Sequence, residues 1–410
     1  MKIEPHKKPS NVSRRQFVAA AGASVLSAAV FQPGISFGAE SDAQVNIGLI
    51  GCGGRGQWIA GLFNKHGGYR FVAAADYFKD KVDAVGDAMG IPAERRFTGL
   101  SGYKRLLEQK LDAVAIISPP YFHPEQAAAA VEAGKHVYLA KPTAVDVPGC
   151  MSIEGSGRRA TEKKLVFLVD FQTRTHRLLQ DCAQRVHEGR AGEIISAEAS
   201  YETGPVGEEV DAARRSDPKN QELRLRAWVT DRLFSGDIIT EQNIHSLDLA
   251  CWLLDATPLR AYGTGGKRRN FVGDCWDHFS VVYYFPKDIV LSFNSKQAGY
   301  GYEDIMCRIY GATWTVDAHY FGKVAFKSKD DYFSGDVGNL YTTGAEANIA
   351  TFHDNVVQAN CQNLTVAPSV RSNLTTILGR TAAYKNAEVT WEKMLQEQER
   401  FVVDLKGLKA

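Results

Sequence analysis

The sequence predicts an α/β protein: a doubly wound parallel sheet in the first half, then an α/β unit with an open, mostly antiparallel sheet. Two observations predict this fold class. Between Val45 and Asp170, short β-branched runs alternate with Ala-rich stretches of helical length. This alternation requires right-handed crossovers, and therefore a parallel sheet covered by helices on both faces. Between residues 194 and 318, β-rich segments lie closer together, and short turns join the later ones.

Five strands are expected in the first sheet. They are VNIGLI (45–50), RFVAAAD (70–76), DAVAIIS (112–118), HVYLA (136–140) and LVFLVD (165–170). Ligands of such sheets bind beyond the carboxyl ends of the strands. Candidate functional residues are therefore those that follow these strands.

The second half supplies five further strand segments and two late helices. The strands are IISAEASYE (194–202), HFSVVYYF (278–285), DIVLSFNS (288–295), DIMCRIYG (304–311) and TWTVDA (313–318), and the helices cover EANIATFHDNVVQA (346–359) and SNLTTILGRTAAY (372–384). The turn Pro286-Lys287-Asp288 joins the second and third of these strands, so an antiparallel sheet is expected. The polar residues 207–226 read as a long surface excursion.

Composition excludes several classes of function. The 410 residues are 44% hydrophobic and 23% charged, which fits a globular chain of two domains. With 48 Lys and Arg against 47 Asp and Glu, the net charge is +1, so no global field favours nucleic acid or an anionic membrane. We expect a small-molecule partner. The seven cysteines form no CxxC pair and are expected to be mostly buried thiols.

Residues 1–40 have the layout of a secretory signal. Basic residues precede an apolar run from Phe17 to Phe31, which small residues follow. The twin arginines in Ser13-Arg14-Arg15-Gln16-Phe17-Val18 resemble the bacterial Tat signal, which implies that the Tat machinery exports the folded chain, to the periplasm or otherwise out of the cytoplasm. We expect no membrane segment in the mature form. The alternative is a basic tail followed by a small amphipathic helix.

A glycine-rich turn follows the first strand and predicts dinucleotide binding. Gly51, Gly53 and Gly56 have the spacing GxGxxG, and a helix is expected to open at Arg55 or Gly56. These glycines allow a tight turn, a close approach to pyrophosphate and close packing of helix on strand. Asp76, about twenty residues on, would bind the ribose hydroxyls and repel a 2′-phosphate. NAD is therefore favoured over NADP, with Gly54 and Arg55 also in the cofactor loop.

Three further stretches carry a family resemblance. They are SPPYFHPEQAAAAVEAGKHVYLAKP (118–142), FQTR (171–174) and EQNIHSLDLACWLL (241–254). Together with the glycine turn, they resemble the family of glucose-fructose oxidoreductase, inositol dehydrogenase and MocA proteins (Gfo/Idh/MocA). The resemblance implies an NAD(P)-binding Rossmann domain at 44–172 and a domain for substrate binding and oligomerisation at 173–410. A homo-oligomer, a dimer or tetramer, is also implied.

The resemblance assigns catalytic and substrate-binding roles to four residues. Lys141-Pro142 matches the family's Lys-Pro dipeptide, and Glu241, His245 and Asp248 match its D-x-x-x-H-x-x-D pattern, with glutamate first. Glu241 and His245 are four residues apart, so on one helix the carboxylate would orient the imidazole. Either Lys141 or His245 can serve as the base. Without the family pattern, His245 reads as a core histidine.

Five other residues are assigned to the cofactor or the substrate. Ser118, Pro119 and His123 match a loop that touches the cofactor, Gln172 is expected near the nicotinamide, and Arg174 near the substrate. Local structural roles are the alternatives for His123 and Arg174.

Two further features of the sequence bear on the chemistry of the site. Ala140 stands where the family commonly has glutamate, which puts the tuning of Lys141 in doubt. We expect no metal site, because Cys275, Asp277 and His278 at a strand start read as structural.

These residues predict an enzyme that transfers a hydride between a tightly bound NAD and a hydroxyl of a sugar, sugar alcohol or glycoside. An alternative is an NAD-dependent glycosidase that works by transient oxidation, elimination and re-reduction, although its typical Tyr-Thr-His stretch is missing. A third interpretation is a binding protein without turnover. The sugar, the carbon oxidised and the route of cofactor recycling are left open.

Overall fold

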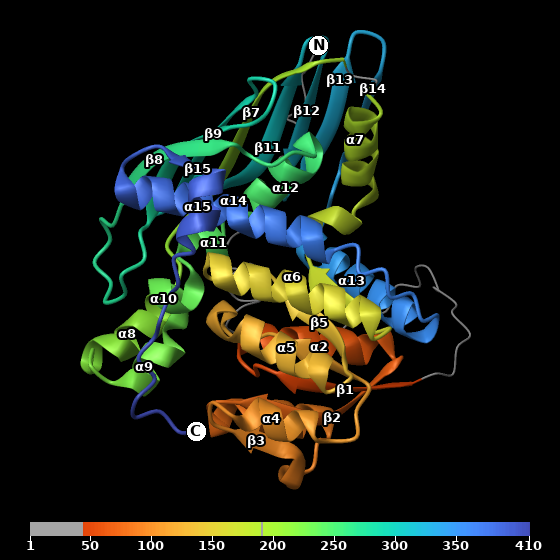
Figure 1. The fold of residues 1–410 in the computed structure, drawn as a ribbon, viewed down its shortest axis with the longest axis vertical. Helices are drawn as coiled ribbons and strands as arrows, with labels where there is room; N and C mark the ends of the chain where they lie inside the picture. The colour runs from red at the N-terminus through yellow and green to blue at the C-terminus, as the bar shows by residue number, and fades with distance from the viewer. Residues whose placement is uncertain (1–43, 190–191) are drawn as a thin grey trace, which may run out of the picture.

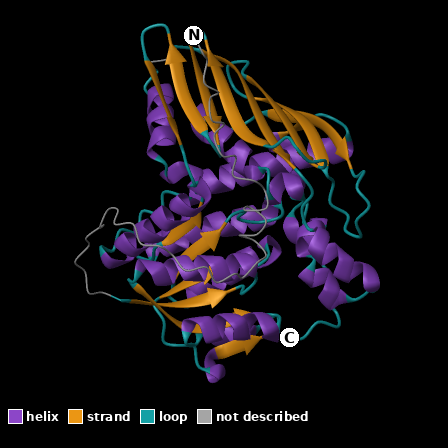
Figure 2. Cartoon of the chain, turned by 180° about the vertical axis from the view of Figure 1, so that it is seen from behind, coloured by secondary structure: helices purple, strands orange, loops and turns teal. Residues whose placement is uncertain are grey.

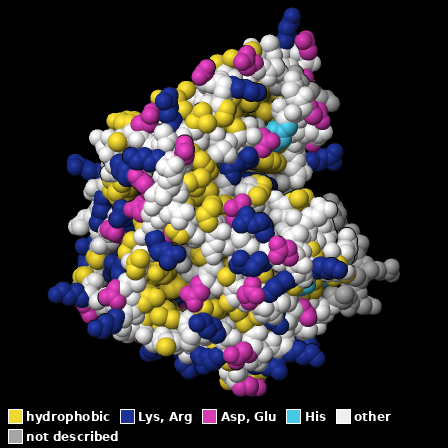
Figure 3. Space-filling view, viewed as in Figure 1, with side chains coloured by type: hydrophobic (Ala, Val, Ile, Leu, Met, Phe, Trp, Pro, Cys, Tyr) yellow, Lys and Arg dark blue, Asp and Glu magenta, His cyan; other side chains and the backbone are white. Residues whose placement is uncertain are grey.

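The computed structural model describes residues 44–189 and 192–410, so the predicted signal lies outside the described residues. Two sheets, each with its own helices, lie one above the other along the long axis (Figure 1). Within the described ranges, no helix has the length and apolar character that crossing a membrane requires. On the face drawn in Figure 3, basic and acidic side chains are interspersed, in keeping with the near-zero net charge.

The first sheet is parallel and has the strand order β3-β2-β1-β4-β5-β6. Its strands are β1 (Val45–Ile50), β2 (Tyr69–Asp76), β3 (Arg96–Thr98), β4 (Ala113–Ile116), β5 (His136–Ala140) and β6 (Phe167–Asp170). Its helices are α2 (Gly54–His66), α3 (Lys79–Met89), α4 (Gly102–Leu107), α5 (His123–Glu132) and α6 (Val147–Glu162). The chain changes direction across the sheet at β1, which places a ligand crevice beyond the ends of β1 and β4.

The second sheet has nine strands in the order β14-β13-β12-β11-β7-β10-β9-β8-β15. They are β7 (Ile194–Thr203), β8 (Arg260–Gly266), β9 (His278–Tyr284), β10 (Val290–Gln297), β11 (Asp304–Gly311), β12 (Trp314–His319), β13 (Lys323–Ser328), β14 (Tyr332–Asp336) and β15 (Val389–Thr390). All neighbours are antiparallel except β7 and β10. The predicted fold class is confirmed, although β3 of the first sheet and β8 and β13 to β15 of the second sheet were not predicted.

Helices cover the face of this sheet that is turned toward the first domain, as Figures 1 and 2 show. They are α7 (Arg177–His187), α12 (Ile244–Leu254) and α14 (Val366–Lys385). Helix α13 (Leu340–Val357) returns to the first domain and packs on α2. Short helices connect these elements: α10 (Arg232–Ser235), α11 (Ile238–Glu241), α15 (Trp391–Glu397) and the 3-10 helices η1 (Ala93–Arg95), η2 (Pro120–Phe122), η3 (Thr173–Thr175) and η4 (Trp228–Thr230).

The polar excursion at 207–226 is helical. It contains α8 (Glu208–Ser216) and α9 (Gln221–Arg226), which lie beside the final segment of the chain, residues 399–410 (Figure 1). All seven cysteines are free, and six of them are buried, as their lack of paired spacing predicts.

Candidate active site

The glycine turn has the geometry of a dinucleotide cradle. Gly51 adopts a φ of +95°, and a Cβ there would lie 2.5 Å from the backbone nitrogen of Ser118. A Cβ at Gly56 would collide with the carbonyl oxygen of Gly51, whereas one at Gly53 would meet no atom within 4 Å. Gly53 therefore leaves room in front of the N-terminus of α2, whose first N–H groups favour a phosphate.

Asp76 lies where the ribose of a bound dinucleotide is expected. Its carboxylate ends β2 and accepts the backbone N–H groups of Cys52 at 2.7 Å and Phe78 at 2.9 Å. Burial raises the pKa of Asp76, and these two hydrogen bonds oppose that rise. The carboxylate lines a cavity of about 230 Å³, which Gly51 and Gly53 also line. These residues fit NAD.

The loop after β4 closes the other side of this cavity. Ser118 and Pro119 line it, and the Ser118 hydroxyl donates to Gln126 Oε1 at 2.5 Å. His123 is buried behind the loop, with Nδ1 2.9 Å from the Pro142 carbonyl oxygen and Nε2 2.8 Å from the Ser118 carbonyl oxygen. Burial lowers the pKa of His123 to about 4. In this position His123 ties the loop after β4 to the one after β5.

Lys141 follows β5 and reaches the second domain. Its Nζ donates to the Glu241 carbonyl oxygen at 2.6 Å and to the Glu241 carboxylate at 3.3 Å. Burial lowers the pKa of Lys141 and raises that of Glu241, while their mutual attraction opposes both shifts. The predicted catalytic residues from the two domains are thus brought together.

The structure pairs Glu241 with Lys141 and not with His245. Glu241 ends α11, Gln242 and Asn243 break the helix, and His245 lies in the first turn of α12. The expected one-helix arrangement of the two residues is therefore wrong. The Nδ1 atom of His245 has no hydrogen-bond partner within residues 44–189 and 192–410.

The surroundings of His245 keep it neutral. Its ring lies 5.1 Å from that of Tyr320, edge to face. Burial, together with the charges of Lys141 and Arg55, holds the pKa of His245 well below its ordinary value of 6.5. A neutral imidazole carries one ring nitrogen without a proton, and this nitrogen can accept a proton.

Asp248 and Arg174 form a buried ion pair. Arg174 donates to the two Asp248 carboxylate oxygens at 2.5 and 3.1 Å, and Asp248 is 0% exposed. The carboxylate thus holds Arg174 in place, and a substrate contact of Asp248 stays a prediction.

A second group of polar side chains surrounds the end of β6. Arg55 pairs with Asp170 at 2.8 Å, and its guanidinium lies over the ring of Trp58. Buried Gln172 accepts a hydrogen bond from the Tyr320 hydroxyl at 3.3 Å. Asp170 and Tyr320 were missed in the sequence. The position of Asp170, at the carboxyl end of a predicted strand, was the available signal for it.

Two family models match the two domains. Residues 45–171 match the oxidoreductase family model with an NAD-binding Rossmann fold, and residues 179–316 match the GFO/IDH/MocA C-terminal domain. The chain belongs to the Gfo/Idh/MocA family. The predicted family, its NAD-binding first domain and its oxidoreductase class are confirmed, whereas the roles of individual residues stay predictions.

The family members most similar to this chain include an inositol dehydrogenase. Inositol 2-dehydrogenase of Rhizobium meliloti is 24% identical over 352 residues, which are 83% of this chain and 96% of that protein. Glycosyl hydrolase family 109 protein 3 of Phocaeicola vulgatus is 31% identical over 174 residues, 38% of this chain and 29% of that protein.

A solved structure shares the fold. Scyllo-inositol dehydrogenase from Lactobacillus casei, with bound NAD(H) and scyllo-inositol, matches with a TM-score of 0.67 at 16% identity. The match covers 85% of this chain and 99% of that chain.

Proposed function

We propose that this protein is an NAD-dependent dehydrogenase of a ring hydroxyl in a cyclic polyol or sugar. The observation that carries the proposal is the Lys141–Glu241 contact between the two domains, with neutral His245 close enough to interact electrostatically with Lys141. The likeness to inositol 2-dehydrogenase over 96% of that protein's length supports the substrate class.

The residues divide the chemistry between them. NAD, when bound, supplies the acceptor for the hydride that leaves the carbon. His245, which burial keeps neutral, takes the hydroxyl proton. Lys141 donates a hydrogen bond to the same oxygen and stabilises its developing negative charge, while Glu241 fixes the position of the ammonium group.

The proposal is tested with the purified protein and a panel of inositols, aldoses and methyl glycosides. Reduction of nicotinamide, followed by its absorbance, is expected with at least one cyclic polyol or sugar, and one ketone should form for each nicotinamide reduced. No reduction with any member of the panel would overturn the proposal.

A second candidate is a glycosidase that oxidises its substrate transiently. The 31% identity to the glycosyl hydrolase family 109 protein over 174 residues favours it. The two candidate functions differ in whether reduced cofactor accumulates and in whether the glycosidic bond is cleaved. A glycosidase of this kind releases the aglycone with no net reduced cofactor, whereas a dehydrogenase leaves the glycosidic bond intact.

We also propose export of the folded protein to the periplasm by the Tat machinery, with NAD already bound. The support is the segment Ser13-Arg14-Arg15-Gln16-Phe17-Val18 together with the dinucleotide cradle. Because the periplasm holds no pool of NAD, the cofactor must be reoxidised in place by a second carbonyl substrate, by return of the hydride to the same molecule, or by a separate electron acceptor. Substituting Arg14 and Arg15 with lysine should leave the protein in the cytoplasmic fraction.

We further propose a homo-oligomer, a dimer or tetramer, formed through the second sheet. Helices cover one face of that sheet, and exposed side chains such as Ser292 and Asn294 of β10 line the other. Sedimentation equilibrium of the purified protein tests this proposal, and a monomer at micromolar concentration would contradict it.

A further inference from the structure

The cavity beside Asp76 is walled by both domains. Asp76, Tyr77 and Phe78 line it from the first domain. Four residues of the excursion and the turn after it line the opposite side: Val210, Leu225, Arg226 and Trp228. Because Asp76 marks the ribose position, the adenosine end of a bound NAD would lie between these two walls.

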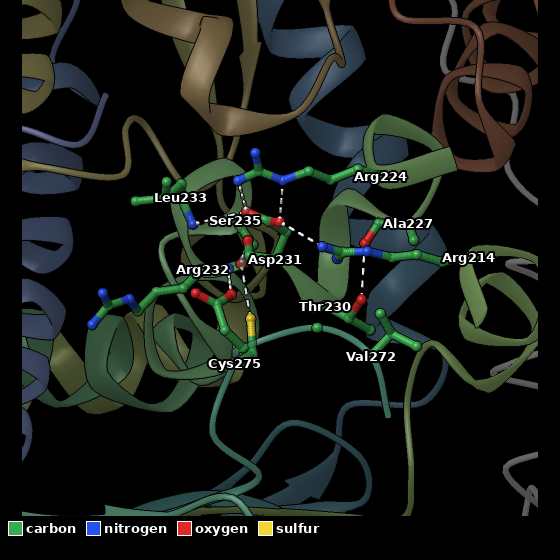
Figure 4. A network of polar contacts seen from close by, with 12 residues as sticks. Arg214, Arg224, Ala227, Thr230, Asp231, Arg232, Leu233, Ser235, Val272 and Cys275 are labelled. Atoms are coloured by element: carbon green, nitrogen blue, oxygen red, sulfur yellow. Dashed lines mark hydrogen bonds and ion pairs between the residues drawn. The ribbon is translucent and has the colours of Figure 1, made fainter. Parts of the chain in front are cut away.

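A buried ion-pair network holds the excursion on the second domain (Figure 4). Asp231 accepts from Arg224 of α9 at 2.7 and 3.1 Å, and from Arg214 of α8 at 3.2 Å. Asp231 is 2% exposed. Removing a buried carboxylate would leave two arginines unpaired, so the two helices are fixed firmly to this network.

The excursion also contacts the first domain directly beside the cavity. The Tyr77 hydroxyl donates to Glu222 of α9 at 2.8 Å. The Arg226 guanidinium lies 3.9 Å from the centre of the Phe78 ring and donates to both carboxylate oxygens of Asp80, at 2.7 and 3.2 Å. These contacts join α9 to the segment that follows Asp76.

The final segment of the chain contacts both the cavity wall and α9. The backbone N–H of Lys409 donates to the Tyr77 hydroxyl at 3.1 Å, and the Leu100 N–H donates to the Lys409 carbonyl oxygen at 3.0 Å. The Lys409 ammonium group lies 3.3 Å from the Glu222 carboxylate. Tyr77 and Leu100 both line the cavity. The segment therefore links the cavity wall to α9.

We propose that residues 207–228 and 399–410 form an adenosine clasp, which closes over the adenosine end of bound NAD and sets its rate of release. The inference rests on the proposed function, in which the cofactor stays bound between turnovers. Release would require α9 and the final segment to separate from Tyr77 and Leu100, which breaks several contacts together. Each exposed contact is weak by itself, but the clasp combines them around one exit.

Two changes test the clasp without removing a side chain that lines the cavity. Glu222→Ala removes the acceptor shared by Tyr77 and Lys409. Deletion of residues 403–410 removes the final segment from Tyr77 and Leu100. Each change is expected to speed NAD release by about tenfold or more. A tenfold change corresponds to about 1.4 kcal/mol.

The measurement is the exchange of bound NAD for isotope-labelled NAD. Holoprotein is mixed with an excess of labelled NAD, samples are separated from free nucleotide at intervals, and the bound nucleotide is analysed by mass spectrometry. Lys219→Ala, an exposed lysine between α8 and α9, is the matched control and should exchange at the wild-type rate.

The possible outcomes separate the clasp from the proposed function. Faster exchange in Glu222→Ala and unchanged exchange in Lys219→Ala support the clasp. Unchanged exchange in Glu222→Ala overturns it, whether or not the shortened chain folds, while leaving the proposed function intact. A wild-type protein that binds no NAD overturns both.

Discussion

His245→Gln isolates the proposed proton transfer. The glutamine keeps a polar side chain of similar length and loses no hydrogen bond at Nδ1, because that atom has no partner among the described residues. A positioned proton acceptor contributes about 10²- to 10⁴-fold to rate, which corresponds to about 3 to 5 kcal/mol in the barrier. The rate of hydride transfer should therefore fall by at least about a hundredfold while NAD stays bound.

The lowered pKa of His245 also predicts how the rate of hydride transfer changes with pH. Burial and the nearby positive charges hold the pKa of His245 well below 6.5. The wild-type rate should therefore stay constant as the pH falls past 6.5, the pKa of an ordinary histidine. At lower pH the imidazole takes a proton and the rate falls. This acid limb should disappear in His245→Gln.

The assay is a single turnover of bound nicotinamide after mixing with a substrate from the panel. His187→Gln, an exposed histidine on α7, is the control and should react at the wild-type rate. A near-normal rate in His245→Gln, with NAD still bound, would refute the reasoning and leave Lys141 as the base.

Three other predictions follow from the site. Asp76→Ser should relax the preference for NAD, because the repulsion of a 2′-phosphate is lost; NADP bound to the wild-type protein, detected by mass spectrometry, would contradict this. Glu241→Gln should lower the pKa of Lys141 further, since the attraction of Glu241 raises it, and the alkaline limb of the rate should move to lower pH. Burial lowers the pKa of His123 to about 4, below its ordinary 6.5. Stability should therefore fall as the pH drops from about 6.5 to about 4, and His123→Gln should reduce this slope in denaturant titrations.

The sequence was sufficient to predict those strands and site residues whose positions depend on local sequence pattern. Strands β1 and β5 have the predicted bounds, and Asp76 ends β2 as expected. Parallel strands place their carboxyl ends at one edge, so Lys141 after β5 had to lie near the crevice. The glycine turn followed from sterics alone, since a side chain at Gly51 or Gly56 would collide with backbone.

Ion-pair and hydrogen-bond partners that lie far apart in the sequence could not be predicted from local pattern. Glu241 pairs with Lys141, 100 residues away, so the four-residue spacing to His245 predicted the wrong partner. Asp248 is engaged by Arg174, 74 residues away. The polar composition of residues 207–226 predicts a surface excursion and gives no partner for its arginines. In the structure, Arg224 pairs with Asp231 and Arg226 pairs with Asp80.

The most direct test of the account uses the dialysed protein with no added nucleotide. A reactive cyclic polyol or sugar is mixed with it, and the absorbance of reduced nicotinamide is recorded against the concentration of chains. The account predicts a rise that stops near one reduced nicotinamide per chain. An added electron acceptor should then lower the absorbance, because it reoxidises the bound cofactor, and substrate oxidation should resume. No rise without added NAD, followed by continuous turnover when free NAD is supplied, would contradict a retained cofactor.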